Sequence, residues 1–309
     1  MPAYKLGGFT ANISLLAGFE IEEQIIVSSI DISWISITSV DAVVVVDGPS
    51  MTESIDTYTP MIAAINGGKT PKIGFAFTFT DLTNGDTHTG VYSTGEGSVV
   101  ESTVLDMEYC GGAGILITDG GAVVCSTEVK VSNGGSSGVV LDNNATIRGF
   151  GLLSVLNAED GLVMNDNSLA EFGDDVDCNS NTARGITMSR SCTLTSSQEI
   201  VSVNNGAQGL NATRQCTVQG SSMSISNNGD GIFLGFTSHM RCAVDMNATN
   251  NGDDFIVDYA SRVEAGSFIS TAPHDLNIFR GSIVSRAGGS GGTNVSTNSI
   301  SANGILFDY

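Results

Sequence analysis

The sequence predicts an all-β solenoid, a parallel β-helix whose coils repeat every 22 to 24 residues. The first observation is a glycine followed by apolar residues that recurs at nearly constant spacing. The second is an ending of alternating apolar residues before asparagine. The third is composition: Gly accounts for 38 of 309 residues and Pro for only 5, which suits frequent corners and strands that are paired on both sides.

Each repeat begins with Gly, or late in the chain Asp, and then an apolar segment. The starts are spaced by 24, 23, 24, 24, 22, 23 and 21 residues: Gly114, Gly138, Gly161, Gly185, Gly209, Gly231, Asp254 and Asp275. A short apolar pair such as Cys192-x-Leu194 lies in the middle of the repeat, so we expect three strands per coil. Leucine-rich and calcium-binding repeats are excluded because their residue spacings are absent.

The repeats end at asparagine, which tolerates left-handed backbone geometry and can hydrogen-bond to its equivalents in a stack. We expect such a ladder through Asn133, Asn157, Asn205, Asn227 and Asn250. The corner at Cys178 to Asn181 departs from the pattern and is expected one residue out of step. Cys192 and Cys216 each follow their coil's Gly by seven residues, so they are expected to stack in the core as thiols.

The two ends of the chain are less regular. The expected divisions are an attachment or cap segment (1–24), irregular first coils (25–111) with a hairpin insertion (70–97) turning at Asn84-Gly85, regular coils (112–280), and a β-rich C-terminal cap or trimerisation tail (281–309). Met61 to Ile65 is the one short helix candidate.

The chain is acidic, with 12 Lys and Arg against 33 Asp and Glu and a formal charge of −21. This charge argues against nucleic-acid binding through phosphate neutralisation. The longest apolar run, residues 42–46, is too short for membrane insertion, and no secretory signal is expected. Cys and His do not cluster with metal-ligand spacing, so neither a metal nor another cofactor is expected.

The coil starts G-[ILV]-x-[ILM] and the coil ends before Asn resemble right-handed parallel β-helix proteins of the pectin-lyase-like type, and within them bacteriophage tail fibres and tailspikes. The closing segment, residues 291–307, looks like the C-terminal ending of many phage fibre chains. The resemblance implies a virion protein assembled in the host cytoplasm as a homotrimer. It also implies attachment of the N-terminus to tail or baseplate proteins and a lateral surface that binds host surface polysaccharide.

Arginines recur along the regular coils. Arg190 and Arg214 each lie five residues after the glycine that starts their coil, so they are expected in a row on one face. Such guanidinium groups could bind acidic sugars, or could form ion pairs within the chain or with a neighbouring subunit. They are the candidate glycan-binding residues.

A glycosidase site needs two carboxylates about 5 to 10 Å apart, and neighbouring strands lie about 4.8 Å apart. Asp174 and Asp175 on one coil, with Glu199 on the next, are the catalytic candidates. Three functions stay open: a fibre that adheres to host polysaccharide, which we favour; a tailspike that depolymerises it; and a purely structural virion protein.

Overall fold

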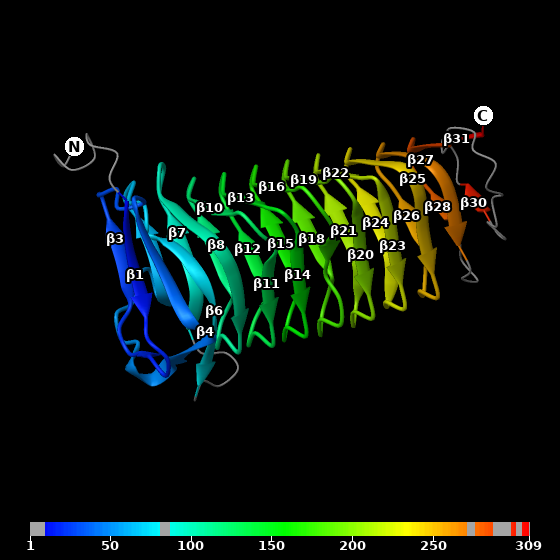
Figure 1. Ribbon diagram of the computed structural model, residues 1–309. Coiled ribbons are helices and arrows are strands. Elements are labelled where there is room, and N and C mark those ends of the chain that lie inside the picture. Colours follow the sequence, from blue (N-terminus) through cyan, green and yellow to red (C-terminus); the bar gives the residue numbers. More distant parts are fainter. Residues whose placement is uncertain (1–9, 81–86, 271–275, 287–297, 301–304, 309) are drawn as a thin grey trace. The chain divides into compact units, whose positions relative to one another are not determined.

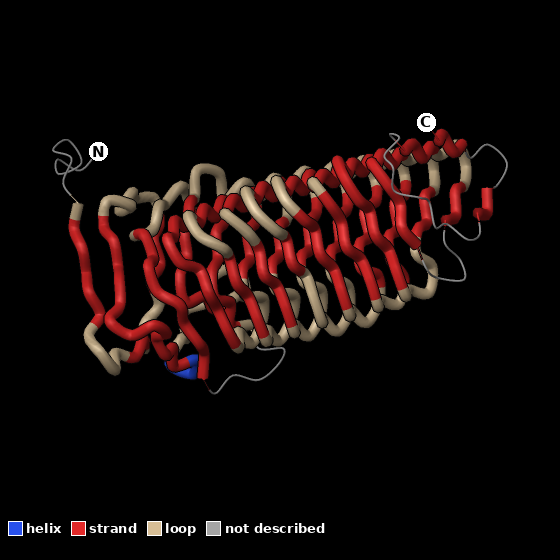
Figure 2. The backbone as a smooth tube through the Cα atoms, turned by 45° about the vertical axis from the view of Figure 1, so that its right-hand side comes forward, coloured by secondary structure: helices blue, strands red, loops and turns tan. Residues whose placement is uncertain are grey.

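β-strands build nearly all of the described structure (Figure 1). The computed structural model describes residues 10–80, 87–270, 276–286, 298–300 and 305–308. Within these ranges the helical content is one short 3-10 turn, η2 (Gly48–Ser50). The chain divides into two units, residues 1–150 and 151–309, and each is a stack of parallel strands joined by corners (Figure 2). The predicted all-β parallel β-helix is confirmed.

Unit 1 (residues 1–150) has long, uneven strands followed by short ones. They are β1 (Ala11–Leu15), β2 (Glu20–Ile21), β3 (Ile25–Ser28), β4 (Ile35–Asp47), β5 (Thr59–Ile65), β6 (Lys72–Thr80), β7 (His88–Thr94), β8 (Val99–Glu108), β9 (Ile115–Thr118), β10 (Ala122–Cys125), β11 (Val129–Ser132), β12 (Val139–Leu141) and β13 (Thr146–Gly149).

Unit 2 (residues 151–309) is more regular. Its strands are β14 (Leu152–Val155), β15 (Leu162–Asn165), β16 (Leu169–Phe172), β17 (Val176–Asp177), β18 (Ile186–Ser189), β19 (Thr193–Ser196), β20 (Glu199–Val203), β21 (Gln208–Thr213), β22 (Thr217–Gly220), β23 (Ser222–Ser226), β24 (Asp230–Gly235), β25 (His239–Thr249), β26 (Phe255–Val257), β27 (Arg262–Ser270), β28 (Leu276–Ile278), β29 (Ile283–Arg286), β30 (Asn298–Ile300) and β31 (Ile305–Asp308).

The register of unit 2 matches the repeat found in the sequence. The residues directly after the coil starts pair in one parallel column: Leu162, Ile186, Leu210, Ile232, Phe255 and Leu276. The first five of these side chains are almost completely buried, because alternate side chains point inward and stack on their equivalents in the next coil. The expected three strands per coil hold as far as β23, and β25 then pairs with both β22 and β23 as one long strand.

The thiol stack is confirmed. Cys192 and Cys216 are buried neighbours one residue before the paired Thr193 and Thr217, and both are free cysteines. Cys192 Sγ donates to the carbonyl of Ser189 (3.1 Å) and Cys216 Sγ to that of Thr213 (2.9 Å). These bonds satisfy carbonyl groups at the corner that follows each first strand.

The expected asparagine ladder exists in unit 2, in a shifted register. Four side-chain amides donate to the equivalent side chain of the next coil: Asn157 to Asn181 (3.0 Å), Asn181 to Asn205 (3.1 Å), Asn205 to Asn228 (3.0 Å) and Asn228 to Asn251 (3.2 Å). Asn251 then donates to Asp254, three residues further along the chain (2.9 Å). Asn157 and Asn205 are therefore in the ladder, Asn181 joins them, and buried Asp254 is the last acceptor in the series. The prediction is wrong for Asn227 and Asn250, which lie one residue before the ladder with φ of 55° and 59°. It is also wrong for Asn133 in unit 1, which has φ of 54° and whose Nδ2 donates to Ser132 Oγ at 3.5 Å.

The shift has a cause in the strand that precedes the ladder. Ser202 pairs with Ile225, so the two stand at the same inward position. Ser202 is buried and accepts a hydrogen bond from Asn205 Nδ2 (2.9 Å), whereas Val203 faces outward. The sequence prediction aligned Val203 with Ile225 because both are apolar. That alignment is one residue out of register, and a shift of one residue exchanges the two faces of a strand.

The predicted hairpin over residues 70–97 is wrong. β6 pairs in parallel with β4 and β8, while β7 pairs in parallel with β5 and β9 in the other sheet. The two strands are thus two sides of one coil, and the Asn84-Gly85 turn lies outside the described residues.

The helix candidate Met61 to Ile65 is also wrong, because this segment belongs to β5. Both faces of β5 are covered: Ile62 pairs with Val91 in the inward column, and Ala63 packs with Tyr92 and Leu116 on the outer side. Burial on both faces removes the alternation that marks a strand in the sequence.

The tail that was expected to form a cap is described only in part. β30 pairs in parallel with β28, and β31 pairs in parallel with β29. The described part of residues 281–309 therefore has the pairing of a further coil.

Candidate functional site

A column of outward-pointing residues follows the first strand of each coil in unit 2. We call it the corner ridge; its residues are Asp166, Arg190, Arg214, Phe236, Tyr259 and Arg280, with φ of 50°, 64°, 60°, 56°, 53° and 49°. Strand pairing one or two residues earlier places them one above another, as with Asn165, Ser189 and Thr213. The left-handed backbone is rare for residues other than Gly, and its repetition at this corner turns six side chains to the surface.

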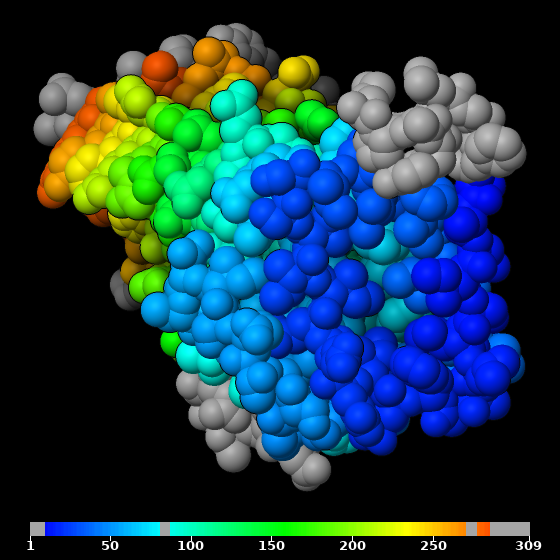
Figure 3. All heavy atoms as spheres, turned by 90° about the vertical axis from the view of Figure 1, so that its left-hand side faces the viewer, coloured from blue at the N-terminus to red at the C-terminus, as the bar shows by residue number. Residues whose placement is uncertain are grey.

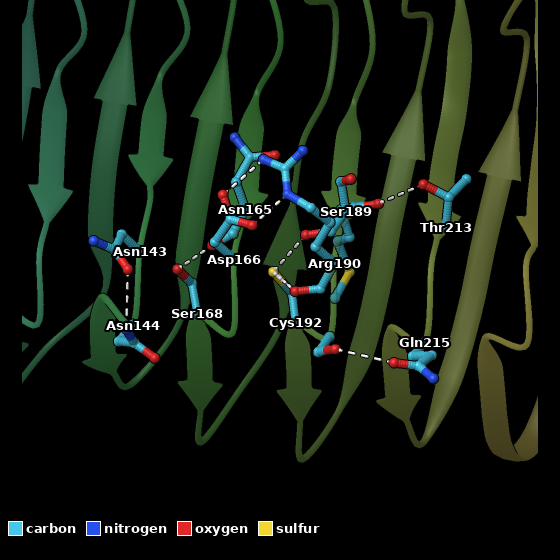
Figure 4. A network of polar contacts seen from close by, with 12 residues as sticks. Asn143, Asn144, Asn165, Asp166, Ser168, Ser189, Arg190, Cys192, Thr213 and Gln215 are labelled. Atoms are coloured by element: carbon cyan, nitrogen blue, oxygen red, sulfur yellow. Dashed lines mark hydrogen bonds and ion pairs between the residues drawn. The ribbon is translucent and has the colours of Figure 1, made fainter.

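One end of the corner ridge is an ion pair. Arg190 Nη2 donates to Asp166 Oδ2 at 2.7 Å, and Nε contacts the other carboxylate oxygen, so the pair is bidentate (Figure 4). At the next position of the corner, Ser191 Oγ donates to Gln215 Oε1 at 3.4 Å. Both charges of the Arg190–Asp166 pair are thus neutralised within one chain.

The other end of the corner ridge is an aromatic and cationic stack. The rings of Phe236 and Tyr259 are parallel, with centroids 4.2 Å apart and planes at 10°. Arg280 covers the far face of Tyr259 at 4.1 Å and pairs with Asp258 at 3.7 Å. Phe236 and Tyr259 are 43% and 37% exposed. Part of each aromatic ring is therefore accessible to a ligand.

Arg214 lies between these two ends. Among the described residues its guanidinium makes no ion pair, hydrogen bond or ring contact, and the side chain is exposed. The face of Phe236 that points toward the Arg214 coil is likewise not covered by a ring or guanidinium within that part of the chain. The corner ridge therefore offers one unpaired cation beside one open aromatic face.

This pair of groups suits a sugar that carries an acidic group. A guanidinium binds a carboxylate with two parallel N–H donors, and an aromatic ring offers an apolar surface to the C–H face of a pyranose ring. Arg190 and Arg214 share the column that the sequence predicts, but Arg190 is bound to Asp166. Of the two candidates, Arg214 alone presents an unpaired guanidinium.

Sequence reasoning missed the aromatic members of this site. Phe236, Tyr259 and Arg280 each lie five residues after Gly231, Asp254 and Asp275, as Arg190 and Arg214 do after their coil starts. Extending the column to every coil, whatever the residue type, would have found them.

The carboxylate candidates lie at a different corner, between the second and third strands of their coils. Asp175 Oδ1 accepts the backbone N–H of Glu199 at 2.9 Å, which brings Asp175 and Glu199 together. Asp174 accepts a bond from Ser196 Oγ at 2.6 Å, through its backbone carbonyl. Burial raises the pKa of Glu199, and the charge of Asp175 raises it further.

Comparisons with known proteins identify no relative of this chain. No protein-family model matches the sequence, and no curated protein matches it. The described ranges contain no helix long and apolar enough to span a membrane. Within the same ranges, no group of three or more His, Cys, Asp or Glu side chains is arranged to hold a metal ion.

Proposed function

We propose that this protein is an adhesive β-helix of the phage tail fibre or tailspike type, which binds host surface polysaccharide through the corner ridge. The observation that carries the proposal is the unpaired, exposed guanidinium of Arg214 beside the stacked rings of Phe236 and Tyr259. Because the whole chain carries a charge of −21, it repels long polyanions, whereas one unpaired cation beside an aromatic ring can bind a single anionic group of a sugar.

The proposal includes the assembly that the resemblance implies. The chain forms a homotrimer in the virion, with residues 1–24 attached to tail or baseplate proteins and the lateral surface of the coils binding host polysaccharide. The Arg190–Asp166 pair supports a sugar-facing corner, since Arg190 finds its partner within its own chain and needs none from a neighbouring subunit.

Binding to immobilised, purified bacterial capsular and O-antigen polysaccharides tests the proposal. Arg214→Ala and Phe236→Ala should weaken binding by about tenfold or more, because each removes a contact worth on the order of 1.5 kcal/mol. Arg190→Ala is the matched control at the same corner and should change binding less than about threefold, with unchanged mass in sizing chromatography. Binding by Arg214→Ala equal to that of the unchanged protein would refute the role of the corner ridge.

A second candidate function is cleavage of the polysaccharide by Asp175 and Glu199. A raised pKa suits a general acid, and a neighbouring carboxylate supplies the second group of a glycosidase. In this case purified polysaccharide should gain reducing ends, and Glu199→Gln should abolish them while binding persists. If the unchanged protein releases no reducing ends, the adhesive function stands alone.

A further inference from the structure

The first coil of unit 1 leaves strand edges unpaired. Within the described residues β1 pairs with β4 and β3 pairs with β5, each along one edge. The opposite edges present backbone N–H and C=O groups that can accept another strand. A solenoid end of this kind is a site for β-strand addition.

The hydrophobic core is open at the same end. Ile13, Ile37 and Ile73 stand at one inward position in successive strands, and their exposure falls from 48% to 8% to 0%. Ile13 is thus a core-facing residue that no described coil covers. A cavity of about 570 Å³ opens here, lined by apolar residues that include Leu15, Phe19 and Ile13.

Figure 3 looks onto this end of unit 1 and shows a hollow in which lighter blue atoms are visible between the dark blue ones. The wall of the cavity also carries Glu20, Glu22 and Glu23, and no Lys or Arg is among its lining residues. These glutamates make no ion pair in the described part of the chain, whereas Lys69 and Lys72 are paired with Asp31 and Glu101. The open end therefore combines an apolar floor with a negative wall.

We infer that this end receives an extended segment of a partner protein, one that carries apolar side chains flanked by Lys or Arg. The segment adds as a strand to β1 or β3, places its apolar side chains against Ile13 and Phe19, and pairs its cations with the glutamates. A second copy does not fit, because two such ends would face each other with like charges. The inference gives a chemistry to the attachment role proposed for residues 1–24 and is independent of the glycan site.

Fluorescence anisotropy with two labelled peptides tests the inference on the full chain. The first peptide alternates Lys with Val and Ile, and the second replaces each Lys by Glu. The Lys peptide should bind at least about tenfold more tightly. Equal binding of the two peptides, or binding of neither, would overturn the inference.

Variants then locate the binding. Combined Glu20→Gln, Glu22→Gln and Glu23→Gln should weaken the Lys peptide about tenfold or more, while Glu96→Gln, at an exposed corner of unit 1, should leave it unchanged. The triple variant should bind polysaccharide as the unchanged protein does, which separates this test from that of the glycan site. Ile13→Ser gives a second test that leaves the charges intact, and it should also weaken the peptide.

Two outcomes decide against the proposed occupant. Concentration-dependent dimers that disappear in the Ile13→Ser variant would assign the open end to a second copy. Peptide binding that appears only after removal of residues 1–9 would show that the chain fills its own cavity. Equal binding with and without residues 1–9 supports the inference.

Discussion

Units 1 and 2 build the same kind of coil by different means. In unit 1 the equivalent residues Ile25, Ile62, Val91 and Ile115 are separated by 37, 29 and 24 residues. In unit 2 the column from Leu162 to Leu276 advances by 24, 24, 22, 23 and 21 residues. Regular spacing lets the same side chain recur at one corner, so unit 2 can use ladders of hydrogen bonds where unit 1 depends on the size of its core residues.

The interiors show this difference. Unit 1 packs Phe75, Phe77 and Phe79 with neighbouring rings 6.4 and 6.0 Å apart. After the third strand of its coils, the left-handed residues Tyr109 and Asn133 are followed by Cys110 and Gly134. At the same corner of unit 2, left-handed residues such as Asn204 are followed by the ladder asparagines. An amide ladder is a fully satisfied buried network, and such networks fail steeply when one member is lost.

Loss of a ladder residue should have the largest effect. Asn205→Ala removes donors to Cys178 O, Ser202 Oγ and Asn228 Oδ1, together with the acceptor for Asn181. Because several buried groups lose their partners, the free energy of unfolding should fall by about 4 kcal/mol. Urea denaturation followed by circular dichroism measures it.

Asn204 provides the control for this variant. It has φ of 59° and is exposed one residue before the ladder, so Asn204→Gly should change stability by less than about 0.5 kcal/mol. Equal losses at positions 204 and 205 would mean that the corner conformation, and not the ladder, supplies the stability.

Substitution of the glycines at the coil starts should have the next largest effect, and its size should differ between the two units. A Cβ at Gly185 would lie 1.8 Å from Ser202 Oγ and 2.7 Å from the carbonyl oxygen of Gly209, while one at Gly114 would lie 2.2 Å from Val131 Cγ1 and 3.0 Å from the nearest carbonyl oxygen. We expect Gly185→Ala to cost about 3 kcal/mol and Gly114→Ala about 2 kcal/mol. Thermal and urea unfolding measure both losses of stability. A larger loss for Gly114→Ala would show that the residues around Gly185 make room for a methyl group more easily than Val131 does.

These glycines also show how far the sequence predicts the structure. The coil starts could be predicted because a position with no room for a Cβ is occupied by Gly in most repeats, as at Gly114 and Gly185. The corner ridge was found only in part, since its members share a backbone conformation while their side chains differ, as Arg214 and Phe236 do. The hairpin at 70–97 was mistaken because parallel pairing depends on distant segments, which a local turn signal does not report.

The end of the ladder tests whether the stack needs a terminal acceptor. Asp254 is fully buried, and its Oδ1 accepts Asn251 Nδ2 at 2.9 Å. Asp254→Ala removes this acceptor, while Asn251 Nδ2 still donates to the carbonyl of Ile225 at 3.0 Å. Stability should fall by about 2 kcal/mol, less than in Asn205→Ala because fewer hydrogen bonds are lost. Hydrogen exchange measured by mass spectrometry should show the loss of protection in residues 246–257 first; uniform loss across unit 2 would indicate that the ladder acts as a single cooperative element.

The smallest expected effect concerns two carboxyl groups with a raised pKa, one in each unit. Burial raises the pKa of Glu199 in unit 2 and the charge of Asp175 adds to it, whereas burial raises the pKa of Asp106 in unit 1 and the charge of Lys130 opposes the rise. In each case this carboxyl group loses its proton at a lower pH in the unfolded chain than in the folded chain. Stability therefore falls as pH rises from the ordinary carboxyl pKa through the raised one, and it is fully present below that window.

Glu199→Gln and Asp106→Asn each remove a carboxyl group whose ionisation destabilises the fold. Each variant should therefore raise the free energy of unfolding at neutral pH, by no more than about 0.5 kcal/mol because both groups are partly solvated. Salt distinguishes the two units. Added NaCl screens the repulsion from Asp175, so the gain from Glu199→Gln should shrink with ionic strength. The gain from Asp106→Asn should change little, since Lys130 acts against Glu108 and Glu128. Urea denaturation at two salt concentrations measures both, and a salt-independent gain at Glu199 would assign its raised pKa to burial alone.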